Sequence, residues 1–137
     1  MKNRTLPVKT RILFLFTLLC AAVASVQIVH AATITVANTL DSGAGSLRDA
    51  LAAGNDGDTI DFGAAVTGTI TLTSGELVVN DSITISGPGA DVLSVNGNAA
   101  SRVFHVASGK IVSISGLTIT NGNASDGGGE FGMRTRH

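Results

Sequence analysis

The stretch that decides the fold is SITISGPGADVLSVNGN, residues 82–98. It contains two short runs in which aliphatic and polar side chains alternate, Ser82–Ile85 and Leu93–Val95, and this alternation is typical of a β-strand with one buried face. Turns rich in Gly, Asn and Asp follow each run, and these residue types favour tight turns for local backbone reasons. The repeating unit is therefore a short strand followed by a turn.

The same unit recurs on both sides of that stretch. The other strands that the alternation predicts span residues 69–72, 76–79, 103–106, 112–114 and 117–119. Turns recur roughly every ten residues, a spacing that a sandwich, a barrel and a solenoid all permit. Two features favour the solenoid: the strands are short, and several end in Asn (Asn80, Asn96, Asn121), whose side chains we expect to hydrogen-bond from coil to coil. We predict an all-β protein, a right-handed parallel β-helix.

One short helix interrupts the strands. Ser46 occupies an N-cap position, and Leu47, Ala50 and Leu51 then recur at helical spacing until Gly54 marks the stop. A helix of about two turns persists only when its apolar stripe covers something. We therefore expect Leu47 and Leu51 to close the open end of the solenoid.

The N-terminus predicts export. The first eleven residues contain four basic side chains and no acid, and no charged side chain occurs from Ile12 to Val26, as in a secretory signal peptide. Val29 and Ala31 fit the −3 and −1 positions of a cut before Ala32; a cut one residue later is the alternative. An uncleaved membrane anchor is the competing interpretation, because about 17 to 25 apolar residues span a bilayer.

Loss of residues 1–31 would change the charge and the redox chemistry of the chain. Nine Lys and Arg and ten Asp and Glu are present, and four of the nine basic residues precede Ala32, which leaves five against ten and a net charge of −5. Nucleic acid and anionic membranes need a basic surface, so neither binding to nucleic acid nor membrane insertion of the mature chain is expected. Cys20, the single cysteine, belongs to the apolar segment, so disulfides are not expected.

The segment Thr33–Val36, followed by Asn38–Leu51 (NTLDSGAGSLRDAL), resembles the N-terminal cap of bacterial right-handed β-helix surface proteins. Its Gly-Ser-Leu-Arg-Asp-Ala core is similar to the Ser-Leu-Arg-Glu-Ala signature of that cap. The likeness continues through residues 57–62, 68–72, 85–90 and 114–122. Proteins of this kind are described as adhesin-like, polymorphic outer-membrane or autotransporter-type. The resemblance therefore implies the fold rather than a single activity.

The end of the chain departs from that family pattern. A relative would continue after Gly129 with an aliphatic strand and further coils, whereas here residues 130–137 follow and hold two of the five basic residues that remain after Ala32. We expect a truncated fragment with a non-native tail; a short polar tail is the alternative. The predicted parts are a signal peptide (1–31), a cap (32–56, helix about 46–53), the first coils (57–129) and the atypical tail (130–137).

The sequence predicts no catalytic, cofactor-binding or metal-ligating residue, and no cofactor. His105 has no second His or Cys at ligand spacing, so we expect a solvated histidine on a strand face. The oxygen-rich run Asn55-Asp56-Gly57-Asp58 lacks the closing Glu of an EF-hand and is expected to form a turn.

Two pairs of acids are the nearest approach to a catalytic site: Asp58 with Asp61 as paired carboxylates for glycoside cleavage, and Asp41 with Asp49 as a base and its helper. Hydrolysis by two carboxylates needs a fixed separation across a substrate cleft, and nothing in the sequence indicates such a cleft. Neither pair is expected to be catalytic.

The leading prediction is an exported, non-enzymatic, adhesin-like protein, secreted or held at the cell surface or outer membrane. Its side surface would contact a host or cell-surface glycan or a matrix. The alternative is the N-terminal part of an extracellular polysaccharide lyase or glycoside hydrolase whose catalytic coils are missing, because fold does not settle activity. The open C-terminal coil is also expected to permit edge-to-edge self-association.

Overall fold

The computed structural model describes residues 30–124. The elements in chain order are β1 (Thr33–Val36), α2 (Leu47–Ala53), β2 (Thr59–Phe62), β3 (Gly68–Thr71), β4 (Leu77–Val79), β5 (Thr84–Ser86), β6 (Leu93–Asn96), β7 (Phe104–Val106), β8 (Ser113–Ser115) and β9 (Thr118–Thr120). Most of the predicted signal peptide and the predicted atypical tail lie outside the described residues.

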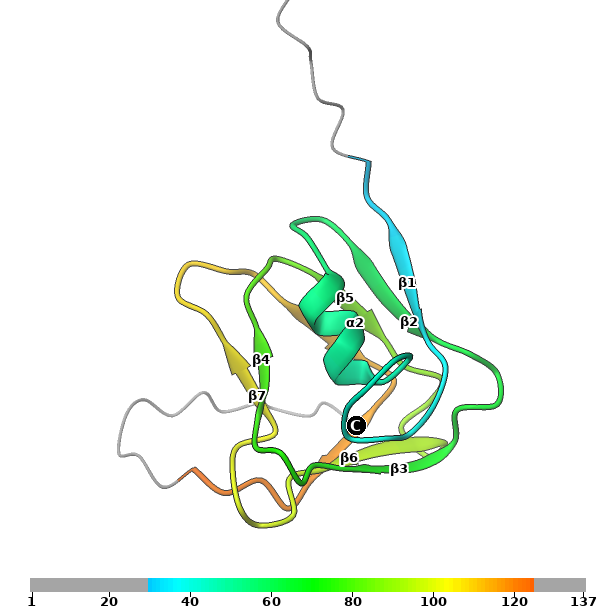
Figure 1. Cartoon of the computed structure of the whole chain (residues 1–137), viewed down its shortest axis with the longest axis vertical. Helices are drawn as coiled ribbons and strands as arrows, with labels where there is room; N and C mark the ends of the chain where they lie inside the picture. Colours follow the sequence, from blue (N-terminus) through cyan, green and yellow to red (C-terminus); the bar gives the residue numbers. More distant parts are fainter. Residues whose placement is uncertain (1–29, 125–137) are drawn as a thin grey trace, which may run out of the picture.

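The strands wind into a right-handed parallel β-helix with three sheets, as predicted. The chain passes through β2, β3 and β4 in one coil and through β5, β6 and β7 in the next, and β8 and β9 begin a third. The sheet orders are β1-β2-β5-β8, β3-β6-β9 and β4-β7, and every pairing is parallel. Figure 1 looks down the coils, so the three sheets lie on three sides of the core.

The core is built from aliphatic side chains that point inward at matching positions of successive coils. Ile60 pairs with Ile85, 25 residues later, and Ile85 pairs with Ile114, 29 residues later. Ile60 and Ile85 are fully buried, as are Ile70 and Val95 in the second sheet. Burial of such a side chain stabilises the fold by about 1.5–3 kcal/mol. The alternation that predicted the strands therefore also identified the core positions.

The predicted strand boundaries differ from the observed ones by one or two residues. The strands β1 and β2 are not among those that alternation predicts, although they lie in the segments 33–36 and 57–62 that carry the family resemblance. β1 and β2 pair along their full lengths, from Thr33 with Thr59 to Val36 with Phe62. β1 therefore starts the first sheet before the first complete coil.

The Asn residues at the strand ends do not form the ladder that we predicted. Asn80 follows β4 in one sheet, whereas Asn96 ends β6 in another. Asn121 lies one position beyond Thr120, the register partner of Asn96. The Asn96 side chain instead accepts a local hydrogen bond from the Asn98 backbone N–H at 2.8 Å. Asn is placed here by turn geometry rather than by stacking.

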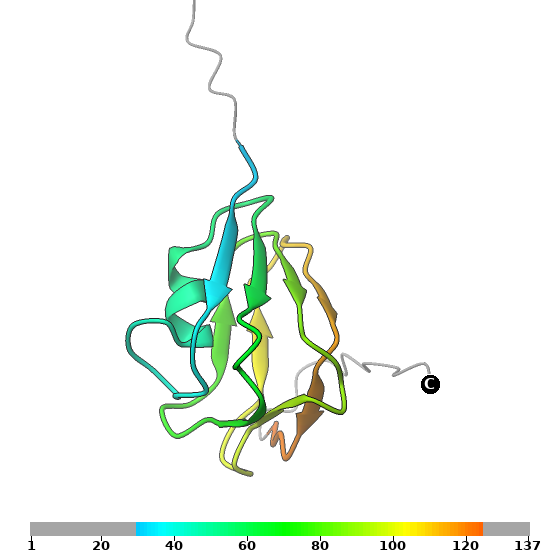
Figure 2. The same ribbon diagram turned by 90° about the vertical axis from the view of Figure 1, so that its right-hand side faces the viewer.

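The helix α2 closes one end of the coils, as predicted. It lies over the core between the three sheets in Figure 1, and Figure 2 shows it at the end opposite β8 and the C-terminal coil. Leu47 is 0% and Leu51 5% exposed, and α2 packs on β1 and β4. The Ser46 hydroxyl accepts a hydrogen bond from the Asp49 N–H at 3.2 Å and so caps the helix.

The helix ends at Ala53, as the sequence predicted, but Gly54 ends it in an unexpected backbone conformation. The backbone N–H of Gly54 donates to the Ala50 carbonyl at 3.1 Å, and Gly54 has a φ of −68°. It therefore does not use the left-handed conformation that usually makes Gly a helix stop. The chain leaves the helix in an extended conformation and leads directly to the turn before β2.

The opposite end of the coils exposes part of the core. Val106 is 37% exposed, whereas Val79, its register partner one coil earlier, is 1% exposed. Ile114 and Ile119 are only partly buried, whereas Ile85, the register partner of Ile114, is fully buried. Within residues 30–124, β7, β8 and β9 pair with an earlier strand and with no later one. In the described part of the chain, this end therefore presents open parallel edges and apolar side chains.

Two glycines let successive coils approach at one corner. Gly87 and Gly116 follow β5 and β8, and a Cβ on Gly87 would overlap the carbonyl oxygen of Gly116. Gly116 has a φ of +64°, which disfavours other residues at that position. The Gly87 N–H donates to the Ser115 carbonyl at 2.8 Å across the same contact. The repeated Ile-Ser-Gly sequence therefore has a steric reason.

We expect Gly87→Ala to lower the free energy of unfolding by about 1–3 kcal/mol, because the added methyl group has no space. Gly63→Ala is the matched control: a Cβ there would lie 3.5 Å from the nearest atom, the Val36 carbonyl oxygen. Its effect should stay within about 1 kcal/mol. Urea unfolding followed by circular dichroism measures both, and equal losses would contradict the coil contact.

Candidate functional site

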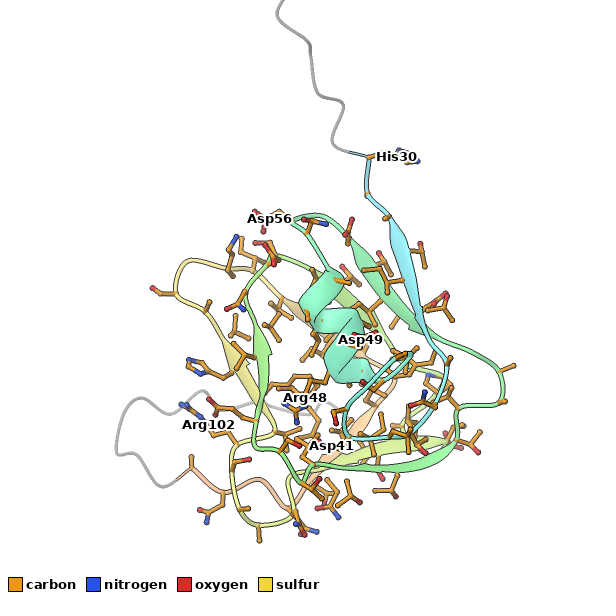
Figure 3. All side chains as sticks on the ribbon, in the orientation of Figure 1. His30, Asp41, Arg48, Asp49, Asp56 and Arg102 are labelled. Atoms are coloured by element: carbon orange, nitrogen blue, oxygen red, sulfur yellow. The ribbon has the colours of Figure 1, made fainter. Side chains whose placement is uncertain are left out.

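Charged side chains in residues 30–124 gather at three places, at the cap, on the β4–β7 sheet and at the turn after α2. Figure 3 labels one or more residues of each: Asp41 and Arg48 at the cap, Arg102 beside β4 and β7, and Asp56 at the turn. The ion pair at the cap joins Asp41 and Arg48 of the cap itself, whereas the ion pairs at the other two places join side chains from different coils.

At the cap, Arg48 of α2 binds two other segments of the chain. Its guanidinium lies 2.8 Å from the Asp41 carboxylate, and it also donates to the backbone carbonyls of Glu76 (2.7 Å), Gly75 (2.8 Å) and Asp41 (3.1 Å). A planar group with several fixed donors suits such a site, which a lysine would fill only in part. Arg48 therefore ties α2 and the loop before it to the turn that precedes β4. This explains the arginine of the Gly-Ser-Leu-Arg-Asp-Ala motif.

Asp41 is held in its ionised form by this arrangement. Burial alone would raise the pKa of its carboxyl, but hydrogen bonds from Ser74, Arg48 and Thr73, and the charge of Arg48, outweigh burial and hold the pKa well below its ordinary value. Asp49, which the sequence paired with Asp41, accepts instead from the Gly45 N–H at 3.4 Å. The two carboxylates thus have separate partners.

Because the folded state lowers the pKa of Asp41, its stabilising effect is present above about pH 4, the ordinary range for Asp, and is lost as pH falls further. We expect Asp41→Asn to lower the free energy of unfolding by about 1–3 kcal/mol at pH 7, since it breaks a charge-assisted hydrogen bond. The gap between wild type and variant should shrink from pH 5 to pH 2. Urea titrations across this range measure it; Asp91→Asn, in an exposed turn, is the control. A gap independent of pH would contradict the assignment.

On the β4–β7 sheet, Glu76 joins two side chains from the next coil. Its carboxylate lies 2.8 Å from Nε of Arg102 and 2.9 Å from Nδ1 of His105. The hydrogen bond from Arg102 is the main cause of a lowered pKa of Glu76, opposed by burial and assisted by His105. His105 is exposed and pairs with Val78 on the outer face, so the predicted solvated strand-face histidine is confirmed. The sequence did not indicate that His105 has Glu76 as a partner.

The run Asn55–Asp58 forms a turn, as predicted. Asp56 accepts from the Ser82 N–H at 2.7 Å and from the Lys110 ammonium at 2.8 Å. Lys110 also lies 3.6 Å from Asp81, so this corner links three coils. Among residues 30–124, no group of three or more His, Cys, Asp and Glu is placed to hold a metal ion.

Asp58 and Asp61, the second pair of carboxylates considered from the sequence, also differ in their hydrogen-bond partners. Asp58 accepts hydrogen bonds from the backbone N–H groups of Ala32 (2.8 Å) and Asn55 (2.9 Å). Asp61 lies on β2, and one of its oxygens is shielded from solvent without a hydrogen-bond partner among the described residues. Both oxygens of Asp58 thus accept hydrogen bonds from backbone N–H groups, whereas this oxygen of Asp61 accepts none in the described part of the chain.

The outer faces of two sheets carry short polar side chains in register, a feature that sequence reasoning did not identify. The rows, from one coil to the next, are Thr33–Thr59–Thr84–Ser113, Thr69–Ser94–Thr118 and Thr71–Asn96–Thr120. Adjacent strands lie about 4.7–4.9 Å apart, and the Thr69 and Ser94 hydroxyls are 3.0 Å apart. Such rows can donate and accept hydrogen bonds at regular intervals along the coils. We call them the hydroxyl rows.

No protein-family profile, no curated protein and no solved structure matches this chain. The resemblance of Asn38–Leu51 to a β-helix cap therefore stays a prediction from the sequence. In the described part of the chain, no helix has the length and apolar character needed to cross a membrane. The fold, the charged clusters and the hydroxyl rows are the features that bear on function.

Proposed function

We propose that this chain is an exported, non-enzymatic, adhesin-like β-helix protein of the cell surface or the extracellular medium. The observation that supports this best is the capped parallel solenoid with its regular hydroxyl rows. A solenoid exposes a side surface that lengthens with each coil and presents the same chemistry repeatedly. This suits a partner that also repeats, such as a glycan chain.

The charged clusters support a structural rather than a catalytic use of the acids. Asp41 is bound by Arg48, Glu76 by Arg102 and Asp56 by Lys110, and each of the three carboxyl groups has a lowered pKa. A general acid needs the opposite change, a pKa raised toward the working pH. The polysaccharide-cleaving alternative gains no support from these acids in residues 30–124.

The hydroxyl rows support glycan contact through hydrogen bonds. The described residues contain Phe62 and Phe104 and no Trp or Tyr, so stacking of sugar rings on aromatic faces is not the expected mode. Each hydroxyl contributes little, about 0.5–1.5 kcal/mol per hydrogen bond. Useful affinity would therefore come from many such contacts along the coils. The open parallel edge at β8 and β9 is a further proposed contact, for another strand or another copy.

Export is tested by expression of the full chain with a C-terminal tag in a bacterial host, followed by cell fractionation and intact mass measurement. We expect a product that leaves the cytoplasm and begins at Ala32. Leu15→Arg places a charge in the apolar segment and should hold the chain in the cytoplasm at full length. A wild-type chain that stays cytoplasmic and uncut would contradict the proposal.

Glycan contact is tested on the exported protein. We expect Thr69→Val with Thr71→Val to weaken binding to a polysaccharide-coated surface about tenfold, because it removes two hydroxyls without changing side-chain shape. Val78→Thr, on the third sheet, should leave binding unchanged. Release of reducing ends or unsaturated sugars from the same polysaccharides would instead favour the enzyme alternative.

A further inference from the structure

Ala32, the residue before β1, is held by hydrogen bonds through both its backbone N–H and its carbonyl. Its backbone nitrogen donates to Oδ1 of Asp58 at 2.8 Å, and its carbonyl accepts from the Thr59 N–H, also at 2.8 Å. Ala32 itself is exposed, and Figure 3 shows His30, two residues earlier, projecting away from the coils. The contact with the coils thus begins at Ala32.

Asp58 is an unusual carboxylate for this surface because it is 4% exposed. The hydrogen bond from Ala32 is the main cause of its lowered pKa, followed by that from Asn55, and both outweigh burial. No cationic side chain of residues 30–124 lies at ion-pair distance from Asp58. The nearby Lys110 is bound to Asp56 and Asp81. Within the described residues, a shielded negative charge therefore faces a neutral amide N–H and has no counter-ion.

The geometry points to Asp58 as the receptor for the α-ammonium group that cleavage before Ala32 creates. This inference rests on the proposed export. Hydrolysis by a host peptidase adds water across the Ala31–Ala32 bond: Ala31 leaves as a carboxylate, and the Ala32 nitrogen takes up protons to become an ammonium group. That nitrogen already lies 2.8 Å from the carboxylate. The cut therefore places a positive charge on the donor and turns this hydrogen bond to the carboxylate into an ion pair.

The same geometry distinguishes the two cleavage positions that the sequence left open. A cut before Thr33 would remove Ala32 together with both of its hydrogen bonds to Asp58 and Thr59. A cut before Ala32 keeps both and supplies the missing positive charge. Processing at Ala32 thus strengthens the attachment of β1 to the first complete coil.

The test makes the cut independent of export. Residues 28–31 of the full chain are replaced by the recognition sequence of a protease that cuts directly after its site, so that the product begins at Ala32. Mass spectrometry then follows acylation of the α-amino group at pH 7. We expect acylation about tenfold slower than in the same product carrying Asp58→Asn, since an ion pair that raises the α-amino pKa by about one unit lowers the reactive fraction by that factor. Asp61→Asn, three residues after Asp58 on β2, is the control. It should change the rate less than about twofold.

A stability measurement covers the case in which Asp58→Asn does not fold. The product beginning at Ala32 is compared with one cut to begin at Thr33, by urea unfolding. At pH 6 the folding equilibrium constant should be about tenfold larger for the Ala32 product. A raised pKa stabilises the folded state below the ordinary α-amino pKa of about 7.7–8.0, and this effect is lost as pH rises through the raised value, so the ratio should fall between pH 8 and pH 10. The charged groups at this corner are Asp56, Asp81 and Lys110, which both products share.

The outcomes separate this inference from the export proposal. Equal acylation rates in the wild-type product and in its Asp58→Asn variant, together with a pH-independent stability ratio, overturn the receptor assignment even if the host exports and cuts the chain. A protected α-amino group in the protease-cut product supports the assignment even if the host does not export the chain.

Discussion

The whole structure depends on parallel register between coils. Ile60, Ile85 and Ile114 take corresponding places in successive coils, and this stacking forms the core while hydrogen bonds between the coils satisfy the backbone. A parallel ladder has two ends, and each end exposes apolar side chains and unpaired backbone. At the first end, Leu47 and Leu51 of α2 cover the core. At the other, Val106 is exposed and Ile114 is only partly buried.

The same register explains why charged and polar side chains meet. Glu76 and Arg102 are 26 residues apart, about one coil, so β4 and β7 bring them to the same sheet. Arg48 acts between the cap and the turn before β4, and thereby holds the helix over the core that it covers. The fold uses its few charges to connect coils and leaves hydroxyl groups on its outer faces. The proposed role in glycan contact follows from that division.

Local patterns predicted the local structure. Alternation gave most strands, and the Ser46, Leu47 and Leu51 pattern gave the helix and its function as a cap. The length of a coil was not predictable, because the turns vary and consecutive coils differ by several residues, from 25 between Ile60 and Ile85 to 29 between Ile85 and Ile114. Without it, neither the Glu76–Arg102–His105 cluster nor the hydroxyl rows could be found. Because the coil length was not known, the prediction of an Asn ladder was also wrong.

The central claim, parallel in-register coils, is tested most directly by disulfide formation between outward-facing positions. In a Cys20→Ser background, Thr59→Cys with Thr84→Cys should form a disulfide under mild oxidation, since register partners on adjacent strands lie about 4.7–4.9 Å apart, within the range for a disulfide. Thr59→Cys with Ser113→Cys, two coils apart, should not. Mass spectrometry of the oxidised protein distinguishes the two pairs, and preferential linkage of positions 59 and 113 would contradict the fold.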